Sequence, residues 1–242
     1  MSRLKGKIVL VTGASAGIGA AVAKAFADAG SAVVLLARRK DRLDQLVEDI
    51  AAKGGSALAL ECDVKHEADV VAAFAATLAA HRRLDILINN AGIADHTPTV
   101  DLSLARWSEV IDTNLTGAFL CAREALRIMI GQGGGRMIHI GSLSATMPRA
   151  NTAAYAASKF ALAGLNHSLA LDGRAHGVAS SIFHPGVVGT ELVARTGDRD
   201  PTTVIGGDVA AQAILAMADL PDHVNFIEGT MLPLAMPYLG RG

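Results

Sequence analysis

The stretch Ile8-Val9-Leu10-Val11-Thr12-Gly13-Ala14-Ser15-Ala16-Gly17-Ile18-Gly19 joins a short apolar run to a glycine-rich turn. An Ala-rich segment of helical character, 20–29, follows at once and ends at Gly30. The order strand, glycine turn, helix is typical of the first unit of a parallel α/β sheet. Glycine lets the backbone approach a ligand closely, and a helix N-terminus offers free N–H groups to an anion. The turn is therefore a candidate pyrophosphate site, the alternative being a plain strand-to-helix connection.

The same alternation of short and long apolar segments continues along the chain. The predicted strands lie at 8–11, 32–36, 58–60, 86–88, 137–140 and 178–183. The predicted helices lie at 20–29, 42–53, 69–80, 105–130, 153–176 and 207–219. Because the strands are apolar throughout, we expect helices on both faces of the sheet. The pattern predicts an α/β fold with a doubly wound parallel sheet in a single domain, residues 1–242, and a mobile substrate loop at 190–205.

Composition excludes several classes of protein. The 242 residues are 51% hydrophobic and 19% charged, with a net charge of -1. Such a chain can bury a sizeable core, but it lacks the basic stripe that nucleic-acid binding needs. No apolar run approaches the ~20 residues that span a bilayer. Cys62 and Cys121 are too isolated for a disulfide framework or a zinc site. We therefore expect a cytoplasmic protein with no metal and no nucleic-acid or membrane partner, in which His139 and His184 serve packing or capping.

The end of the second predicted strand bears on the choice of dinucleotide. An acidic residue there would bond the ribose 2′-hydroxyl of NAD, but the chain reads Leu36-Ala37-Arg38-Arg39-Lys40. Guanidinium groups can hold a 2′-phosphate through charge-assisted hydrogen bonds. Arg38 and Arg39 thus favour NADP over NAD. The alternatives are NAD and a basic helix start that merely faces solvent.

Tyr155 and Lys159 lie four residues apart at the start of a predicted helix, so they share one helical face. A nearby ammonium group favours the phenolate and lowers a tyrosine pKa from its ordinary value of about 10. Such a tyrosine can exchange a proton with an alcohol or carbonyl oxygen. Ser142 follows a predicted strand at the carboxyl edge, where its hydroxyl could hold the substrate oxygen. The alternative is an ordinary surface pair.

Taken together, these residues give the chain its family likeness: it resembles the short-chain dehydrogenase/reductases along essentially its whole length. The matching segments are Thr12-Gly13-x3-Gly17-Ile18-Gly19, Asn89-Asn90-Ala91-Gly92, Asn114, Ser142, Tyr155-x3-Lys159 and Pro185-Gly186-Val187-Val188-Gly189-Thr190. The resemblance implies a Rossmann-type sheet of about seven strands and hydride transfer between a nicotinamide cofactor and a carbon that bears oxygen. It also implies a homodimer or homotetramer that pairs through the helices predicted at 105–130 and 153–176. Their outer faces would carry Ala122, Ala125, Ala161 and Leu165, the alternative being that these residues face the sheet.

The resemblance assigns roles to four residues. Tyr155 would be the catalytic acid/base, and Lys159 would lower its pKa and hold the nicotinamide ribose. Ser142 would orient the substrate carbonyl, and Asn114 would help to hold a water in the proton relay. Since all four are present, an active enzyme is favoured over a non-catalytic dinucleotide-binding regulator.

The resemblance also places the cofactor and the substrate. The implied cofactor residues are Gly13, Ser15, Gly17, Ile18, Gly19, Arg38, Arg39, Asp63, Val64, Asn90, Ala91, Gly92, Tyr155, Lys159, Pro185, Gly186, Val188 and Thr190. The implied substrate pocket contains Ser144, Met147, Arg149 and Val187. Many NADP-using members carry a basic residue where this chain has Ala16, so the NADP prediction depends on the two arginines alone.

The implied activity is that of an NADP-dependent alcohol dehydrogenase or carbonyl reductase. Residues 208–228 are similar to the ending of members that act on serine and 3-hydroxy acids. An NAD-dependent dehydrogenase of such substrates is therefore an alternative. Arg149 is either an anchor for a substrate carboxylate or a plain surface arginine.

Overall fold

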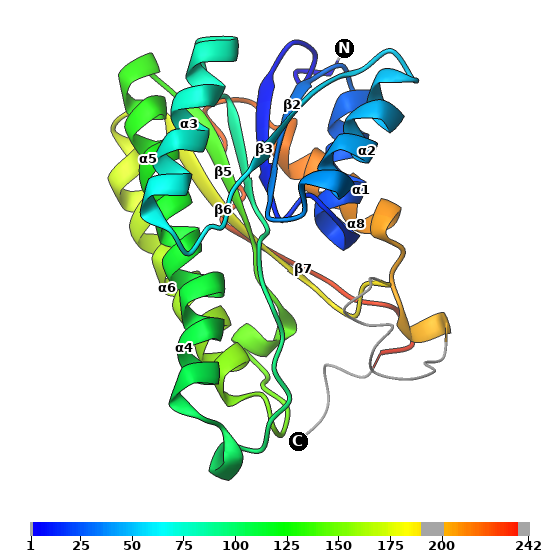
Figure 1. Ribbon diagram of the computed structural model, residues 1–242, viewed down its shortest axis with the longest axis vertical. Helices are drawn as coiled ribbons and strands as arrows, with labels where there is room; N and C mark the ends of the chain where they lie inside the picture. Colours follow the sequence, from blue (N-terminus) through cyan, green and yellow to red (C-terminus); the bar gives the residue numbers. More distant parts are fainter. Residues whose placement is uncertain (1, 190–200, 237–242) are drawn as a thin grey trace.

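The computed structural model describes residues 2–189 and 201–236. Seven parallel strands form one sheet in the order β3-β2-β1-β4-β5-β6-β7 (Figure 1). The strands are β1 (Ile8–Thr12), β2 (Ala32–Ala37), β3 (Ser56–Glu61), β4 (Ile86–Asn89), β5 (Gly135–Ile140), β6 (Val178–Pro185) and β7 (Glu228–Met231). The predicted fold class is confirmed, and each predicted strand is present with somewhat wider bounds.

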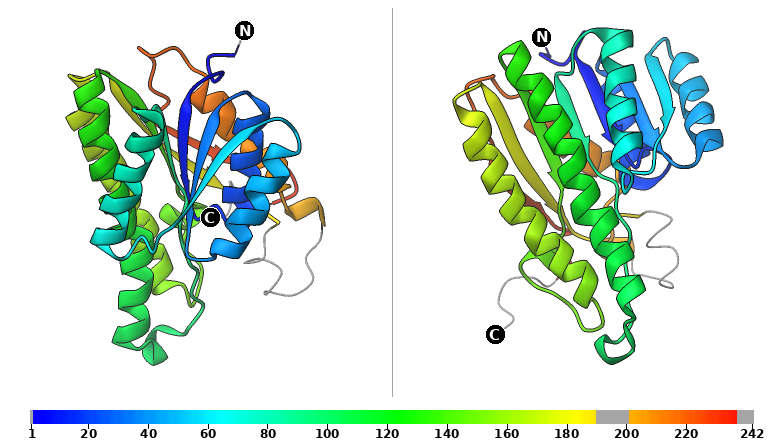
Figure 2. Two further views of the ribbon diagram at one scale, coloured as in Figure 1. Left: turned by 45° about the horizontal axis from the view of Figure 1, so that its top comes forward. Right: turned by 60° about the vertical axis from the view of Figure 1, so that its left-hand side comes forward.

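Helices cover both faces of this sheet, as the apolar strands required. The helices are α1 (Gly17–Asp28), α2 (Lys40–Ala51), α3 (Glu67–His81), α4 (Leu104–Ile111), α5 (Gly117–Gln132), α6 (Ala153–Arg174) and α8 (Gly207–Ala218). One face carries α1, α2 and α8, and the other carries α3, α5 and α6 (Figures 1 and 2). Among the described residues, no helix is long and apolar enough to cross a membrane.

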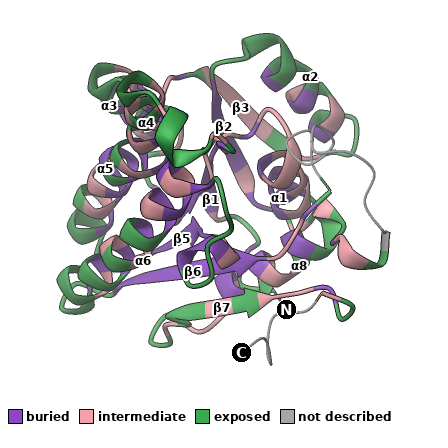
Figure 3. Cartoon of the chain, turned by 90° about the horizontal axis from the view of Figure 1, so that it is seen from below, coloured by how far each residue is buried: buried purple, intermediate pink, exposed green. Residues whose placement is uncertain are grey.

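The core consists of two apolar layers, one on each face of the sheet. Alternate residues of a strand point to opposite faces, so Val9 and Val11 pack toward α1 and α2 while Leu10 packs toward α3 and α5. All three are completely buried. Burial of each such side chain stabilises the fold by about 1.5–3 kcal/mol. Figure 3 shows the buried central strands between helices whose outer faces are exposed.

The segment 105–130 differs from the single long helix expected. It consists of α4, a π-helical turn η2 (Asp112–Thr116) and α5. A single π-turn inside a helical segment has no residue signature of its own, so the sequence pattern did not separate it from the α-helices on either side. Ala122 and Ala125 are fully buried against the sheet and do not lie on the outer face where the family resemblance placed them.

The carboxyl ends of the strands form the edge at which ligands bind in such sheets. The chain leaves β1 in one direction to β2 and β3 and in the other direction to β4, so the order reverses between β1 and β4. A reversal of this kind opens a crevice at the carboxyl edge. Residues 190–200 of the predicted loop lie outside the described residues. Its end is described as far as Ile205, which pairs with Val188 in an isolated bridge.

Candidate active site

The turn between β1 and α1 closes tightly on the end of β4. Gly13 and Gly17 have positive φ angles of 64° and 58°, which other residues rarely adopt. A Cβ atom on Gly13 would lie 2.9 Å from the Asn90 side-chain amide, and one on Gly19 would lie 2.6 Å from the same amide. The first turn of α1 has neither an acidic residue nor a side-chain cap, so its N–H groups face the edge uncapped. The glycine turn and the first N–H groups of α1 together fit the pyrophosphate of a dinucleotide.

Asn90 braces the glycine turn from β4. Its Nδ2 donates to the carbonyl oxygens of Thr12 at 2.9 Å and Gly13 at 3.3 Å. In return, the Thr12 hydroxyl accepts the backbone N–H groups of Asn90 and Ala91, both at 2.9 Å. The segment Asn89-Asn90-Ala91-Gly92 thus has a visible structural role beside the cofactor role implied for it.

Basic side chains gather at the end of β2, next to the glycine turn. Arg38 is exposed, and the Arg39 guanidinium donates to the Ser15 hydroxyl from Nε at 3.2 Å and from Nη2 at 3.0 Å. Asp63 lies just past β3 and accepts the Lys65 N–H at 3.1 Å. Each of these groups is at the carboxyl edge, where the adenosine half of a dinucleotide would lie.

Other implied cofactor residues are less open to a ligand. Val64 is buried, and a Cβ on Gly117 would lie 2.7 Å from its Cγ2 atom. Val188 is 4% exposed and belongs to the core on the α1 face. Their backbone atoms are therefore the groups that a cofactor could reach. Thr190 lies outside the described residues.

Three elements bring the four implied catalytic residues together. Tyr155 and Lys159 lie on α6, Ser142 follows β5, and Asn114 lies in the π-turn η2. The Ser142 side chain lies close enough to the Tyr155 hydroxyl to act on its pKa. The Lys159 ammonium nitrogen lies 5.7 Å from the centre of the Tyr155 ring and donates to the Ile140 carbonyl at 2.7 Å. Phenol, hydroxyl and ammonium thus share one corner of the site.

Asn114 connects this corner to the loop after β4. Its Oδ1 accepts the Ile93 N–H at 2.8 Å, and its Nδ2 donates to the Ile93 carbonyl at 2.9 Å. The same Nδ2 lies 3.1 Å from the hydroxyl of Ser158, the neighbour of Lys159. The π-turn is what brings the amide to this position, and such turns are frequent at functional sites.

Burial dominates the ionisation of the pair on α6. Lys159 is 5% exposed, and burial lowers its pKa to about 8. Burial also raises the pKa of Tyr155 above its ordinary value, against the opposing effects of the Ser142 hydrogen bond and the Arg149 charge. The expected net lowering of the tyrosine pKa is therefore wrong for the protein alone, because desolvation of the phenol outweighs the nearby charge.

The implied substrate pocket lies after Ser142. The Ser144 N–H donates to the Ser142 Oγ atom at 3.2 Å, while the Ser144 side chain is buried. Met147 is 40% exposed, Arg149 is exposed, and Val187 is partly buried. Ser144 thus contacts Ser142 through its backbone, and Met147 and Arg149 are exposed residues of the implied pocket.

An ion pair that the sequence did not indicate fixes the loop after β4. Arg106 on α4 donates from Nε to the buried Asp95 at 2.6 Å and from Nη2 to the Ala94 carbonyl at 2.8 Å. The two side chains are eleven residues apart with no shared periodicity, so no sequence signal joined them. The pair holds the segment that continues from the Asn114 contacts.

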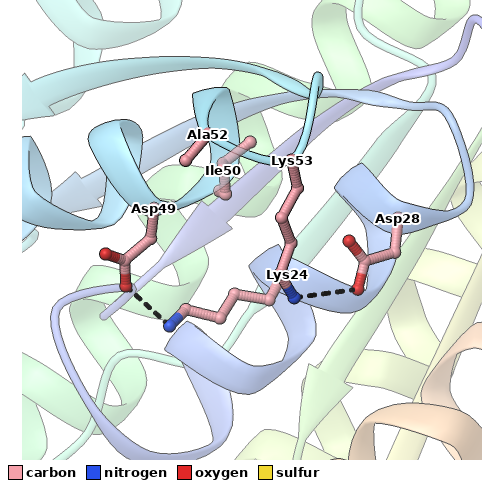
Figure 4. Close-up of a pocket in the computed structure, with 6 residues that line it drawn as sticks. All are labelled: Lys24, Asp28, Asp49, Ile50, Ala52 and Lys53. Carbon is pink, nitrogen blue, oxygen red and sulfur yellow. Dashed lines mark hydrogen bonds and ion pairs between the residues drawn. The ribbon is translucent and has the colours of Figure 1, made fainter.

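A separate depression lies between α1 and α2, at the opposite end of the sheet (Figure 4). It is lined by Lys24, Asp28, Asp49, Ile50, Ala52 and Lys53. Its charges pair with one another, Lys24 with Asp49 at 2.8 Å and Lys53 with Asp28 at 3.9 Å. It is therefore no part of the candidate site. Within residues 2–189 and 201–236, no three His, Cys, Asp or Glu side chains gather as a metal site.

Comparison with known proteins identifies the family. The family model described as short chain dehydrogenase matches residues 7–201. A 3-oxoacyl-[acyl-carrier-protein] reductase of Synechocystis sp. is 37% identical over 193 residues, which are 79% of this chain and 78% of the relative. A D-threitol dehydrogenase of Mycolicibacterium smegmatis is 37% identical over 190 residues, 78% of this chain and 73% of the relative. The chain belongs to the short chain dehydrogenase family and is an oxidoreductase of that type.

Solved structures agree with this assignment. A metagenomic short-chain oxidoreductase in complex with NADP is 36% identical, covers 94% of this chain and 96% of its own, and superposes with a TM-score of 0.84. A 3-ketoacyl-(acyl-carrier-protein) reductase from Brucella melitensis complexed with NADH is 28% identical, covers 94% of this chain and 97% of its own, and has a TM-score of 0.85. The family resemblance in the sequence is thereby confirmed.

Proposed function

We propose that the protein transfers hydride between NADP(H) and the carbinol or carbonyl carbon of an alcohol/ketone pair. The observation that carries the proposal is the placement of the Tyr155 phenol next to the Ser142 side chain and 5.7 Å, measured at the ring centre, from the ammonium nitrogen of the buried Lys159. An absorbance screen of reduced nicotinamide against ketones, aldehydes and hydroxy acids, with each cofactor in turn, tests it. Turnover that requires Tyr155 supports the proposal, and no turnover across the panel contradicts it.

The nicotinamide, when bound, supplies or receives the hydride. In the reducing direction Tyr155 donates its proton to the oxygen of the substrate as negative charge develops there. Ser142, whose Oγ is held by the Ser144 N–H, donates to the same oxygen and orients it. Lys159 would hold the ribose of the cofactor, and its charge would favour loss of the phenol proton in the oxidising direction. Asn114 positions water behind Lys159 through its place beside Ser158.

The cofactor would lie along the carboxyl edge. The N–H groups at the start of α1 would hold the pyrophosphate, and Arg38 and Arg39 would hold the 2′-phosphate of NADP. Support for NADP comes from these two cations and from the absence of a carboxylate at the end of β2. The similar structures described above include one with NADP and one with NADH. The preference for NADP over NAD is therefore argued from Arg38 and Arg39.

Replacing both arginines, Arg38→Ala with Arg39→Ala, should raise the KM for NADPH by about 10- to 100-fold, because charge-assisted hydrogen bonds to the phosphate are lost. The KM for NADH should change little. Initial rates at saturating substrate measure both constants. Lys53→Ala, which removes a cation beyond the opposite end of α2, is the matched control and should change neither. Equal effects on the two cofactors would remove the argument for NADP.

We propose a broad alcohol or carbonyl substrate range, with 3-hydroxy acids as one class. Arg149 supports the acidic class because it is exposed and its charge acts on the Tyr155 phenol. Arg149→Ala should raise the KM for a 3-hydroxy acid by about tenfold, the effect of one lost charged hydrogen bond, and leave neutral alcohols unchanged. Paired kinetics on an acid and its methyl ester measure this. A similar change for both substrates would make Arg149 a surface residue.

We propose further that the protein is a homodimer or homotetramer in the cytoplasm. The outer faces of α5 and α6 support pairing, since they expose Phe119, Ile130, Phe160 and Leu171. Such apolar side chains on adjacent helices are typical of an interface between subunits.

A further inference from the structure

His184 lies directly behind the Ser142 backbone. It is the penultimate residue of β6 and is 2% exposed. Its Nδ1 atom lies 3.1 Å from the Ser142 amide nitrogen and 2.9 Å from the Ser142 carbonyl oxygen. A Cβ atom on Gly141 would overlap the imidazole, so the ring lies against the peptide that leads into Ser142. The histidine that sequence reasoning assigned to packing or capping therefore contacts the catalytic loop.

Glu228 determines how the ring is protonated. The His184 Nε2 atom is buried and makes no well-aligned hydrogen bond among the described residues, but Oε1 of Glu228 on β7 lies 3.3 Å from it. A carboxylate favours the proton on the nitrogen that faces it. With its proton on Nε2, the neutral ring accepts the Ser142 N–H at Nδ1, and with its proton on Nδ1 it donates to the Ser142 carbonyl. The contact with Glu228 favours the first form.

Ser142 is therefore held from two sides. Its Oγ atom accepts the Ser144 N–H at 3.2 Å, and its backbone N–H is accepted by His184. Rotation of the serine backbone would move the hydroxyl away from Tyr155, on whose pKa it acts. Errors of 1 Å in such an arrangement are costly to catalysis.

We propose that His184 is a positioning residue that fixes Ser142 through its backbone N–H, with Glu228 selecting the required tautomer. The inference rests on the proposed function only in that Ser142 acts on the substrate oxygen. When the ring is doubly protonated, Nδ1 can no longer accept the N–H and can only donate to the Ser142 carbonyl. Four groups surround the His184 ring and its carboxylate neighbour. Glu228 on β7 faces the ring, and the Nε2 atom of His167 on α6 lies 4.0 Å from the Glu228 carboxylate. Lys159 on α6 and the Ser142 backbone are the other two.

The first test compares two replacements of similar size. His184→Leu fills the space but accepts no hydrogen bond, and we expect kcat to fall about tenfold with an unchanged KM for the cofactor. His184→Asn places an amide oxygen near the former Nδ1 position, and most of kcat should return. If both variants lose kcat equally while melting as the wild type does, the hydrogen bond is not what matters and the proposal is overturned.

The second test asks whether the effect passes through Ser142. In a Ser142→Ala background, His184→Leu should lower kcat no further, because the hydroxyl to be positioned is absent. Multiplied effects of the two changes would contradict the proposal. Glu228→Ala keeps the test decisive if His184→Leu fails to fold, because Glu228 is on the partly exposed strand β7. This variant should lower kcat a few-fold in the wild type and not in the Ser142→Ala background.

A readout without turnover separates this inference from the proposed function. The amide nitrogen and proton resonances of Ser142 should shift as His184 is protonated, and they should not shift over that range in His184→Asn. Two-dimensional NMR of the full chain measures this. If the amide resonances of Ser142 do not shift as His184 is protonated, the positioning role is overturned, even if the enzyme is active. An enzyme inactive on every substrate, with a Ser142 amide that does titrate, contradicts only the proposed function.

Discussion

Tyr155→Phe lowers kcat by about 10²- to 10⁴-fold and leaves the affinity for the cofactor unchanged, the loss expected when a general acid is removed. Burial keeps the pKa of Tyr155 above its ordinary value, so the phenol is protonated at neutral pH and ready to donate. Phenylalanine keeps the ring and its packing on α6 but removes the hydroxyl that would donate the proton. Single-turnover reduction of a ketone, with cofactor binding followed by fluorescence, measures the two effects separately.

The matched control for this prediction is Ser168→Ala. It removes an exposed hydroxyl from the same helix, where the group bonds only to the Gly164 carbonyl at 3.3 Å among the contacts described. Its kcat should equal that of the wild type. A Tyr155→Phe enzyme within twofold of the wild type would show that another group moves the proton, and the proposed mechanism would fail.

His139→Asn removes a pH dependence of stability that the wild type should show. His139 lies in β5, completely buried, and burial together with the Lys159 charge lowers its pKa to about 4. In the unfolded chain its pKa is about 6.5. Between these two values the unfolded chain binds a proton that the folded protein does not. Stability from this group is complete above pH 6.5 and falls as the pH drops toward 4, by about 3 kcal/mol in total.

Urea unfolding at several pH values between 6.5 and 4 measures this loss. The drop in the free energy of unfolding should be about 3 kcal/mol smaller in His139→Asn than in the wild type. The pKa of His184 is also lowered by burial, but that contribution is present in both proteins and cancels. His96→Asn, at an exposed histidine, should keep the wild-type dependence. Parallel curves for the wild type and His139→Asn would show that the ring is protonated in the folded state.

The local sequence pattern predicted the strands that are buried on both faces of the sheet. The strand β1 and the turn into α1 were clear because a run such as Val9-Leu10-Val11 suits only a covered parallel strand. The strand β7 was not predicted. Its sequence Glu-Gly-Thr-Met is half exposed and carries no apolar run, and its backbone pairing with β6 is what makes it a strand. Figure 3 shows it at the exposed margin of the sheet.

The candidate site likewise has features that the sequence predicted and features that it did not. The pairing of Tyr155 with Lys159 follows from helical spacing, and the place of Ser142 follows from the end of a strand. The contacts of Asn90 with Thr12, of Lys159 with Ile140 and of His184 with Ser142 join segments 19 to 78 residues apart. Such contacts depend on how the strands register, which composition and periodicity do not encode. The raised pKa of Tyr155 was missed for the same reason, since it reflects burial.

The brace that Asn90 provides has a consequence for how a nucleotide arrives. Asn90 and Ala91 hold Thr12 and Gly13 through hydrogen bonds within the protein, so the shape of the turn does not depend on contacts with a ligand. Association then orders few additional backbone angles, so little conformational entropy is lost when the complex forms. A preorganised turn of this kind would bind the proposed diphosphate without rearranging its own backbone.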